Sequence, residues 1–471
     1  MRYAHAVADV RAAERELMAR LPEGTLMQRA AFGLAAAAAG MLREAGSVYG
    51  SRVVLLVGVG DNGGDALFAG ALLAGRGVTV HAVLADPDRA HAEGLSALRE
   101  AGGRVSDHSV VDGADLIIDG LLGIGGRGGL RGPFAEIAAV AAASGAPILA
   151  VDLPSGIDAD TGEIGGAAVQ ADVTVTFGTH KPGLFVDPGA AYAGIVEFVD
   201  IGLEFPASVE PVVENLREED VRELLPAAAR SSHKYSRGVV GLTVGSERYP
   251  GAALLSVGAA LRSGVGAVRY SGPVDVVSSY PEVIMGGGHV QAWVVGSGLG
   301  QEDESVRRLL NVLATDVPVV VDADGLRLLP RKPLDRAAPT ILTPHAGEAA
   351  ALLDVTADQI EEQRLASVRR LADSYDATVL LKGANTLIAS PGVSPVRVNT
   401  HASPALATAG SGDVLAGLVG GLLAGGLDPF DAASVGAYLH GAAGLLAARS
   451  GPVAAGDLVA ALPLAWHNIR G

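Results

Sequence analysis

Two glycine-rich turns in the sequence each carry a carboxylate at the expected start of a helix. The first is Gly58-Val59-Gly60-Asp61-Asn62-Gly63-Gly64-Asp65, which follows an apolar run over residues 53–57. The second is Gly410-Ser411-Gly412-Asp413, which opens an Ala/Gly/Leu-rich segment over residues 413–449. Free amides at a helix start bind anions, and a carboxylate beside them can accept the proton of a hydroxyl that is being phosphorylated. The second turn therefore predicts phosphoryl transfer, and the first fits the G-x-G-x-x-G pattern of a dinucleotide site.

The first turn is more polar than a plain dinucleotide site. Asp61, Asn62 and Asp65 stand where small apolar residues are usual. Carboxylates beside a pyrophosphate repel it unless a cation lies between them. A plain dehydrogenase is therefore a weaker interpretation of this turn, and the phosphoryl-transfer turn has no place in such an enzyme.

Polar residues also follow two other expected strands of the same region. Asp119 ends one apolar run, and Asp152 and Ser155 follow another. The carboxyl ends of neighbouring parallel strands form the ligand crevice of an open α/β sheet, so Asn62 is expected to meet these three side chains there. Oxygen ligands of this kind suit a hard monovalent or divalent cation.

Short apolar runs alternate with helical segments along the whole chain, a rhythm typical of parallel strands joined by helices. In the first part we expect helices over residues 66–73 and 134–143 and strands over residues 53–57, 78–83, 116–118, 148–151, 173–177 and 195–199. In the second part we expect strands over residues 239–244, 292–295, 317–321, 340–342 and 378–382. The pattern lapses over residues 203–225. We therefore predict two different α/β domains without a shared repeat, residues 1–212 with a Rossmann-like doubly wound sheet and residues 213–471.

Composition excludes several classes of protein. The 471 residues include 35 basic and 52 acidic ones, a net charge of -17, without a basic cluster that could neutralise a phosphate backbone, so nucleic acid is not an expected partner. The absence of Cys excludes disulfides, thiolate nucleophiles and Cys-bound metals. The N-terminus lacks the pattern of a secretory signal, and no apolar stretch reaches the ~20 residues of a spanning helix. We expect a cytoplasmic protein that makes no contact with a membrane.

Four ordered motifs over roughly residues 1–205 resemble the NAD(P)H-hydrate epimerase family. They are Gly-x-Gly-[Asn/Asp]-Asn-Gly-Gly-Asp, Asp-Gly-Leu-Leu-Gly-x-Gly, Val-Asp-Leu-Pro-Ser-Gly-x-Asp and Thr-Phe-Gly-x-x-Lys-Pro-Gly. The resemblance implies that Asn62, Asp119 and Ser155 hold a potassium ion and that Asp152 faces the reacting nicotinamide. It also implies that two loops contact the nucleotide, made of Asp61, Asn62, Gly63, Gly64 and Asp65 and of Gly123, Ile124, Gly125, Gly126, Arg127, Gly128 and Gly129. Asp61 departs from the family, which usually has a second Asn at this position. The negative charge of Asp61 either weakens binding of the phosphates or strengthens binding of the cation.

The chemistry of a hydrated nicotinamide suits an Asp and a Lys. The hydroxyl lies on a carbon next to the ring nitrogen, so it can leave and return with proton transfer by positioned groups. Asp152 is the candidate acid or base, with capping of the turn before Pro154 as the alternative. Lys181, one of only four lysines with Lys234, Lys332 and Lys382, is a second candidate in the same crevice, with a surface lysine as the alternative.

The second turn belongs to a different class of phosphate site. No Gly-x-x-x-x-Gly-Lys-[Ser/Thr] is present, which excludes the P-loop class, and Gly-[Thr/Ser]-Gly-Asp resembles the ribokinase-like fold instead. Six motifs over roughly residues 220–471 resemble its NAD(P)H-hydrate dehydratase branch, at residues 249–253, 259–266, 296–300, 321–325, 343–348 and 382–386. The resemblance implies a hydrate site lined by Ala252, Gly298, His345 and Asp413. It implies an adenine-nucleotide site made of Lys382, Gly383, Ala384, Asn385, Thr386 and Gly412.

Small departures and open alternatives remain in this region. Gly325, Ala346 and Ser411 stand where Ala, Pro and Thr are usual, and none of these removes a catalytic group. Asp413 could instead be a helix cap. His345 could be a neutral imidazole that is hydrogen-bonded to a loop carbonyl. Lys234 could be either a solvated charge or a phosphate contact. We expect residues 414–427 to form a packed helix, because they offer no polar groups.

The two resemblances together predict one bifunctional repair enzyme. The first domain would interconvert the R and S hydrates of NADH or NADPH, and the second would dehydrate the S epimer with ADP and magnesium, by phosphorylation of the hydroxyl and elimination of phosphate. We expect a homo-oligomer. Two alternatives are a small-molecule kinase fused to a regulatory nucleotide-binding domain, and a first domain that binds ligands without catalysis.

Overall fold

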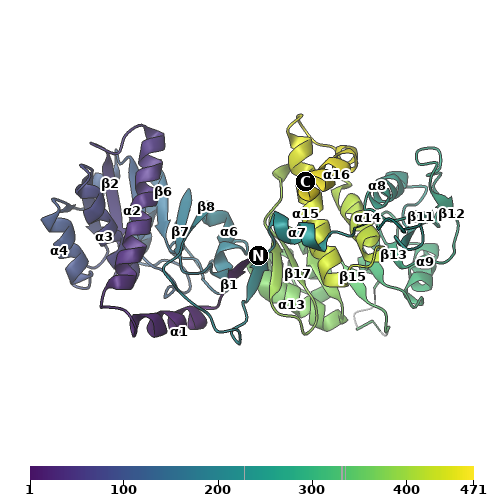
Figure 1. Cartoon of the computed structure of the whole chain (residues 1–471), viewed down its shortest axis with the longest axis horizontal. Helices are drawn as coiled ribbons and strands as arrows, with labels where there is room; N and C mark the ends of the chain where they lie inside the picture. Colours follow the sequence, from purple (N-terminus) through teal and green to yellow (C-terminus); the bar gives the residue numbers. More distant parts are fainter. Residues whose placement is uncertain (228, 330–332, 335) are drawn as a thin grey trace. The chain divides into compact units, whose positions relative to one another are not determined.

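The computed structural model describes residues 1–227, 229–329, 333–334 and 336–471, so Lys332 lies outside the described residues. It divides into two compact units, which are described separately (Figure 1). The first is Tyr3–Val213, and the second is Glu214–Gly471 together with Met1–Arg2.

The first unit is built on a seven-stranded sheet in which all neighbouring strands are parallel. In spatial order the strands are β4 (Arg104–Val105), β3 (Thr79–Leu84), β2 (Arg52–Val57), β5 (Leu116–Gly120), β6 (Ile148–Val151), β7 (Val173–Phe177) and β8 (Ile195–Val199). The helices are α1 (Val7–Met18), α2 (Thr25–Ala45), α3 (Asp61–Ala74), α4 (Ala92–Glu100), α5 (Pro133–Ser144) and α6 (Gly189–Tyr192), with short 3-10 turns at His108–Val111 and Pro182–Leu184.

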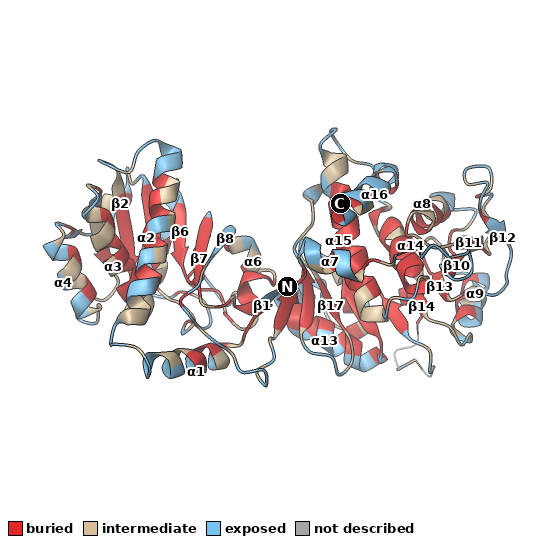
Figure 2. Ribbon diagram, viewed as in Figure 1, coloured by how far each residue is buried: buried red, intermediate tan, exposed pale blue. Residues whose placement is uncertain are grey.

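Helices cover both faces of this sheet. Val53, Leu55 and Val57 of β2 pack in one core with α2, α3 and α4, whereas Val54 and Leu56 pack in another with α5. Successive side chains of a strand point to opposite faces, so a strand covered on both sides must be apolar throughout. Figure 2 shows the strands buried and the outer faces of the helices exposed. The predicted doubly wound sheet is confirmed.

The order of the strands places a crevice at the ends of β2 and β5. The chain runs outward from β2 through β3 to β4 on one side and from β5 to β8 on the other, which makes the β2–β5 boundary the topological switch point where open α/β sheets bind ligands. Asp119 lies in register with Leu56 of β2 and Ala150 of β6. The polar turns after β2, β5 and β6 therefore meet at one edge of the sheet.

The second unit is built on a sheet of eleven strands. Their spatial order is β1 (Arg2–Ala4), β9 (Val213–Asn215), β18 (Val396–Asn399), β17 (Thr386–Ala389), β16 (Thr378–Leu381), β15 (Thr340–Leu342), β14 (Val319–Val321), β13 (Ala292–Val295), β10 (Val239–Thr243), β11 (Ala267–Tyr270) and β12 (Ile284–Met285). Pairs from β12 to β16 are parallel, and the β16–β17 and β17–β18 pairs are antiparallel.

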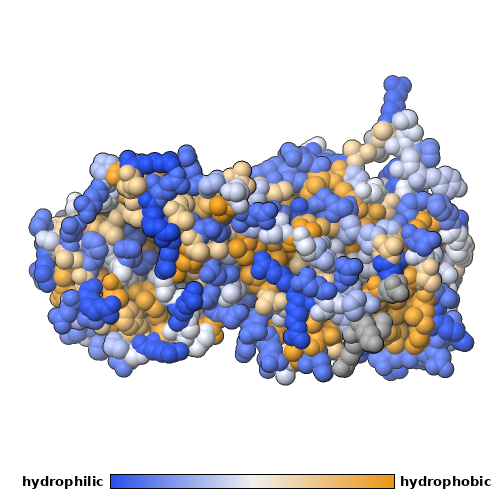
Figure 3. Space-filling view, turned by 90° about the horizontal axis from the view of Figure 1, so that it is seen from below, coloured by the Kyte–Doolittle hydropathy of each residue, from blue (hydrophilic) through white to orange (hydrophobic). Residues whose placement is uncertain are grey.

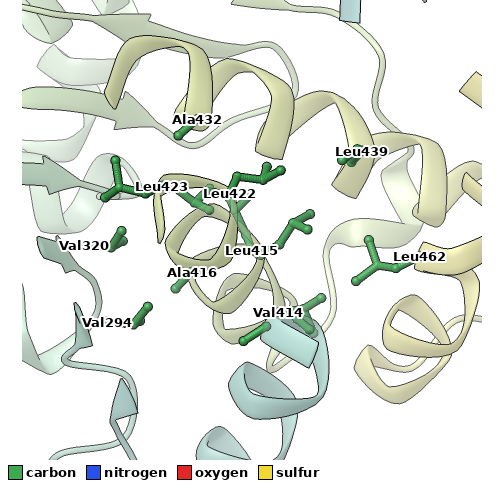
Figure 4. Packing of buried hydrophobic residues seen from close by; sticks show 14 of the residues in the cluster. Val294, Val320, Val414, Leu415, Ala416, Leu422, Leu423, Ala432, Leu439 and Leu462 are labelled. Carbon is green, nitrogen blue, oxygen red and sulfur yellow. The ribbon is translucent and has the colours of Figure 1, made fainter. Parts of the chain in front are cut away.

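The helices of this unit are α7 (Glu218–Leu224), α8 (Pro250–Leu261), α9 (Asp303–Leu313), α10 (Asp324–Leu328), α11 (Ala346–Leu353), α12 (Ala357–Glu362), α13 (Arg364–Tyr375), α14 (Ser411–Ala424), α15 (Pro429–Ala448) and α16 (Ala455–Arg470), with a 3-10 turn at Pro404–Leu406. Helix α14 is buried on all sides from Val414 onward, as predicted, and packs between the sheet and α15 (Figure 4). A Cβ on Gly420 would lie 2.0 Å from Val294 Cγ2, so a small residue is required for this close approach to β13.

Outside these cores the surface is mixed. Figure 3 shows hydrophilic side chains distributed between hydrophobic ones over the face that it presents. Within the described part of the chain, no helix combines the length and apolarity needed to cross a membrane.

Candidate functional site

A cavity of about 1040 Å³ lies in the first unit, at the crevice between the strand ends. Its polar lining includes residues of the helix α1, the start of α3 and the turn after β6, together with residues of the segments 23–28 and 91–93. Glu14, Asp61, Asn62, Asp65 and Asp152 are among them. Ile124, Phe68 and Phe177 are among the apolar residues that line it. The volume and the mixture of a few polar groups with apolar walls are typical of a small-molecule site.

The centre of this polar lining is an ion pair between Lys181 and Asp152. The lysine is 1% exposed, and its Nζ donates to Asp152 Oδ1, to Thr176 Oγ1 at 3.1 Å and to the Phe177 carbonyl at 3.0 Å. Asp152 Oδ1 also accepts from Thr176 Oγ1 and from the Phe177 amide, each at 3.2 Å. All these partners come from the end of β7. They fix the position of the Asp152 carboxylate at the wall of the cavity and place the Lys181 ammonium against it.

The structure contradicts the two alternative interpretations, a surface lysine for Lys181 and a turn-capping carboxylate for Asp152. Lys181 is not a surface lysine, because it is almost fully buried. The Asp152 side chain does not cap its own turn, since its hydrogen bonds run to β7. Asp152 also has φ of 67°, a left-handed conformation that few residues other than glycine adopt. Such backbone outliers are concentrated at functional sites.

The three residues expected to hold a cation lie together beside this cavity. Ser155 Oγ donates to Asp119 Oδ1 at 2.7 Å, and the Ser155 amide donates to Asp119 Oδ2 at 2.9 Å. Asn62 Nδ2 donates to the Val151 carbonyl at 2.6 Å, and its Oδ1 lies towards Gly123. Burial raises the pKa of Asp119 to about 6, although hydrogen bonds from Ser155 and Leu121 lower it.

No basic side chain within the described residues pairs with the buried Asp119 carboxylate. A cation at this set of oxygens would supply the missing positive charge, so the residues fit a hard ion of low charge. A site built from three or more His, Cys, Asp or Glu side chains does not occur in the described part of the chain. The donors that the structure brings together here are oxygen atoms, which suit a hard cation.

The two loops expected to contact the nucleotide differ in how many of their residues line the cavity. Asp61, Asn62 and Asp65 line it, whereas Gly63 and Gly64 are buried in the first turn of α3. A Cβ on Gly63 would lie 2.4 Å from the Gly58 carbonyl oxygen, so the tight turn requires that glycine. Of the second loop only Ile124 lines the cavity among the residues that the structure describes, and Gly123, Gly125, Gly126, Arg127, Gly128 and Gly129 do not.

Carboxylates crowd one side of the cavity. Burial, Asp152, Asp61 and Glu14 raise the pKa of Asp65 well above its ordinary value, and Asp65 Oδ1 has no hydrogen-bond partner among the described residues. Burial, Asp152 and Asp61 also raise the pKa of Glu14, while Lys181 and Arg11 oppose the shift. The cavity therefore holds more acid than its buried lysine can neutralise, and protons, a cation or a cationic ligand must balance the difference.

In the second unit, Asp413 lies beside an ion pair between two other residues. Lys382 Nζ contacts Asp322 Oδ1 at 2.9 Å and Glu348 Oε2 at 3.7 Å. Hydroxyls of Ser297 and Thr343 donate to Asp322 at 3.0 and 2.8 Å. A Cβ on Gly412 would lie 3.4 Å from Lys382 Nζ, so the start of α14 comes directly against this lysine. Burial lowers the pKa of Lys382, but Asp322 and Glu348 outweigh burial and raise it.

Asp413 itself is a half-buried carboxylate with a raised pKa. Burial and then Asp322 raise its pKa to about 6, while Ser297 and Lys382 lower it. The N-cap of α14 is Gly410, which has no side chain to cap the helix, and Asp413 is the third residue of the helix. The cap interpretation is therefore wrong. A carboxylate that exchanges its proton near neutral pH is suited to general base catalysis.

Of the four expected hydrate-site residues, Ala252 and Gly298 lie against each other. A Cβ on Gly298 would lie 2.7 Å from Ala252 Cβ, which puts the loop after β13 against the start of α8. His345 caps α11, where its Nδ1 accepts hydrogen bonds from the Gly347 amide at 3.0 Å and from the Glu348 amide at 3.3 Å. The ring therefore accepts from amides, and the carbonyl-bonded alternative is wrong. Its Nε2 lies 3.5 Å from Glu348 Oε1.

A buried arginine holds the loop that contains Lys382, Gly383, Ala384, Asn385 and Thr386. Arg364 Nη2 donates to the carbonyls of Leu381, Lys382 and Asn385 at 3.1–3.3 Å. A Cβ on Gly383 would lie 2.2 Å from the same nitrogen, so this position requires glycine. The sequence motif indicated the loop but not the arginine, which looks like any other basic residue of an amphipathic helix.

Two further basic side chains have clear environments. The Lys234 ammonium is exposed and lies 5.1 Å from the centre of the Tyr235 ring, which favours the solvated charge over the phosphate contact. His440 is buried, and desolvation lowers its pKa to about 4, so it is neutral at physiological pH. Its Nε2 lies 3.4 Å from Ser411 Oγ in the phosphate-binding turn.

Comparison with known proteins identifies relatives of both units. Residues 240–463 match the NAD(P)H-hydrate dehydratase family, and residues 23–183 match the family of YjeF-related protein N-termini. The bifunctional NAD(P)H-hydrate repair enzyme Nnr of Mycobacterium leprae is 47% identical over 96% of this chain and 96% of its own. The enzyme of the same name from Escherichia coli is 34% identical over 84% of this chain and 81% of its own.

Solved structures resemble the second unit. An ADP/ATP-dependent NAD(P)H-hydrate dehydratase from Bacillus subtilis, co-crystallised with ATP and Mg²⁺, superposes with a TM-score of 0.51 and 31% identity, over 54% of this chain and 97% of that one. A ribokinase-like superfamily protein from Enterococcus faecalis superposes with a TM-score of 0.50 and 25% identity, over 55% of this chain and 97% of that one. The predicted ribokinase-like fold is confirmed.

Proposed function

Since the chain belongs to the family of bifunctional NAD(P)H-hydrate repair enzymes, we propose which of its residues perform the two reactions. The enzyme combines NAD(P)H-hydrate epimerase and NAD(P)H-hydrate dehydratase activities. The kinase, the plain dehydrogenase and the non-catalytic first domain are set aside by this family membership. We assign epimerisation to residues 1–212 and dehydration to residues 213–471.

Epimerisation takes place in the 1040 Å³ cavity of the first unit. Asp152 transfers the proton that must accompany departure and return of the ring hydroxyl. Lys181 supplies a counter-charge to Asp152 and fixes the position of Oδ1, and every hydrogen bond that the Asp152 side chain accepts from described residues falls on that oxygen. Oδ2 is therefore the atom that remains for the substrate. Asp61, Asn62 and Asp65 contact the substrate together with the loop Gly123, Ile124, Gly125, Gly126, Arg127, Gly128 and Gly129.

A potassium ion is proposed at Asn62, Asp119 and Ser155. When bound, it would neutralise the buried Asp119 and attract the phosphates of the dinucleotide. The buried Asp119 carboxylate without a basic partner is the observation that supports this ion.

Dehydration takes place where Asp413, Lys382 and the start of α14 meet. Asp413 accepts the proton of the ring hydroxyl as the hydroxyl oxygen attacks the terminal phosphorus of ADP and AMP leaves. Elimination of inorganic phosphate from the ring carbon, together with a proton from the neighbouring ring carbon, then restores the dihydronicotinamide. Magnesium would supply charge neutralisation on the nucleotide phosphates. Lys382, Gly383, Ala384, Asn385, Thr386 and Gly412 hold ADP, while Ala252, Gly298 and His345 line the hydrate site. We also propose that the enzyme is cytoplasmic, since its substrates are intracellular dinucleotides. A homo-oligomer is a separate proposal.

The observation that carries this division is that each unit has its own lysine–carboxylate pair, with Lys181 fully buried in the first and Lys382 half-buried in the second. Asp152→Asn should abolish epimerisation and leave dehydration of the S hydrate unchanged, and Asp413→Asn should do the reverse. Chromatography of the two epimers without ADP measures the first activity, and recovery of reduced-nicotinamide absorbance from the pure S epimer measures the second. Equal loss of both activities in either variant would contradict the assignment.

A further inference from the structure

Glu14 lines the epimerase cavity together with Asp152, but it comes from a different element. It lies on α1, whereas Asp152 follows β6. The Glu14 side chain is half-buried, and its carboxyl forms no hydrogen bond or ion pair with any described residue. The neighbouring Glu16 differs in both respects, since it is exposed and pairs with Arg20 one turn further along the helix. The Glu14 carboxyl therefore makes no hydrogen bond or ion pair with the described residues that would stabilise the fold, and it faces the cavity.

Inversion at the hydrated carbon needs proton transfer at two places. The C–O bond breaks with its electron pair on oxygen, the ring nitrogen lone pair forms a C=N bond, and the departing hydroxyl takes a proton to become water. Water then adds to the opposite face of the same carbon and gives up a proton. One acid and one base are required, and they must serve opposite faces of the ring.

We propose that Glu14 is the second proton-transfer residue of the epimerase site: it protonates the hydroxyl that leaves one face, and Asp152 accepts the proton of the water that adds to the other. This inference rests on the proposed role of Asp152. The atoms balance, because one water leaves and one returns while one proton passes from Glu14 to Asp152. In the reverse direction the two residues exchange roles, so the enzyme needs no further reactant.

The surroundings of the two carboxyls differ in the way that this division requires. Three donors, one of them the Lys181 ammonium, converge on Asp152 Oδ1, whereas no described donor reaches the Glu14 carboxyl. The charged groups that face Glu14 are Asp152, Lys181, Asp61, Arg11 and Asp65; burial, Asp152 and Asp61 raise the pKa of Glu14 against the two cations. Two carboxyls whose environments separate their proton affinities in one cavity are the usual arrangement of a general acid and a general base.

Other acids of the cavity are less suited to this role. Asp61 is exposed, and Asp65 is buried in α3 and already belongs to the proposed nucleotide loop. Glu23 and Glu93 also line the cavity but are exposed to solvent. Glu23 therefore offers a matched control, because Glu23→Gln removes one negative charge from the same cavity without removing the proposed proton donor.

The test uses the full chain with potassium and without ADP, so that dehydration is idle, and follows interconversion of purified R and S NADPH hydrates by chromatography. Uncatalysed epimerisation is subtracted with an enzyme-free sample. We expect Glu14→Gln to lower kcat about 10²-fold or more with little change in KM. Glu14→Asp should retain far more activity than Glu14→Gln, and Glu23→Gln should stay within about twofold of the parent. The parent rate should fall as pH rises through the raised pKa of Glu14, and this limb should disappear in Glu14→Gln.

Different failures have different meanings. Full activity in Glu14→Gln with loss in Asp152→Asn would overturn the role of Glu14 and leave the site in place. Full activity in both variants would overturn the epimerase site itself. A higher KM for Glu14→Gln with an unchanged kcat and pH profile would show that Glu14 only shapes the cavity, and would also overturn the proposal. If Glu14→Gln unfolds, the pH profile of the parent and the activity of Glu14→Asp decide the question.

Discussion

Each unit places a lysine against a carboxylate, but the two pairs differ: Lys181 is buried, and Lys382 is half-buried. In the first unit, Lys181 pairs directly with Asp152, the proposed proton-transfer group. In the second, Lys382 pairs with Asp322, while Asp413 remains beside the pair with its pKa raised to about 6. The first lysine stabilises the reacting carboxylate, whereas the second is held by a neighbouring carboxylate and faces the phosphate-binding turn.

This difference matches what each reaction needs. Epimerisation moves protons but transfers no phosphate, so a cation bound tightly to the catalytic carboxylate can stay there throughout. Phosphoryl transfer needs a cation near the phosphates and a base that is not neutralised by it. Asp322 separates these two tasks in the second unit, because it orients Lys382 and leaves Asp413 free to accept a proton.

The largest expected effect comes from breaking the first pair. Lys181→Met would leave Asp152 buried without its counter-charge, and breaking a buried pair in this way costs about 3–5 kcal/mol. Calorimetry should show a lower transition temperature for the first unit and no epimerisation, with dehydration of the S hydrate retained. Lys234→Met, at an exposed lysine, is the control and should change stability by less than about 0.5 kcal/mol. Equal stability of both variants would contradict the role of the pair.

The same change in the second unit should affect activity more than stability. Lys382→Met leaves Asp322 with the Ser297 and Thr343 hydroxyls as donors, so we expect a loss of only about 1.5–3 kcal/mol. Dehydration should fall by at least about 10²-fold with a higher KM for ADP, while epimerisation continues. Coupled measurements of ADP binding and unfolding check this. A larger stability loss than that of Lys181→Met would reverse the comparison.

The nucleotide loop offers a smaller effect in the second unit. Arg364→Lys keeps a buried charge but cannot reach three carbonyls at once, so the loop over residues 382–386 should lose its fixed shape. We expect about a tenfold increase in the KM for ADP and little change in the KM for the hydrate. Arg307→Lys, at an exposed arginine of α9, should change neither constant. Parallel increases in both KM values would indicate general destabilisation instead.

The smallest expected effect is a shift in pH dependence. Asp413 must be ionised to accept a proton, so dehydration should decline as pH falls through its pKa of about 6. Ser297→Ala removes a hydrogen bond that lowers this pKa, and the acid limb should move to higher pH by less than about one unit. A profile of kcat/KM against pH measures this. An unchanged limb in Ser297→Ala would show that another group controls it.

The central strands and the glycine turns could be predicted from the sequence because their signals are local. Continuous apolar runs such as β2 and β6 indicate buried strands, and strand-end turns in a parallel sheet must meet at one edge. The two-residue edge strands β4 and β12 are too short for any periodicity to reveal them. The antiparallel β17–β18 pair was not predicted either, since its pairing depends on tertiary packing.

The contacts that complete the sites depend on distant residues and could not be predicted. Lys382 and Asp322 are 60 positions apart, and neither motif indicates that they pair. Glu14 and Arg364 stand on amphipathic helices among similar residues, such as Glu16, that are exposed. Only the packing of each helix decides which acid or base faces the site.

The most direct test is the recovery of reduced-nicotinamide absorbance from an equal mixture of the two NADPH hydrate epimers, with ADP, magnesium and potassium. A sample containing only the Asp152→Asn variant gives the contribution of spontaneous epimerisation. Rapid recovery of all the substrate by the parent enzyme, with rapid recovery stopping near half in Asp152→Asn, is the predicted result. Rapid recovery that stops near half in the parent as well would contradict the proposed epimerase site.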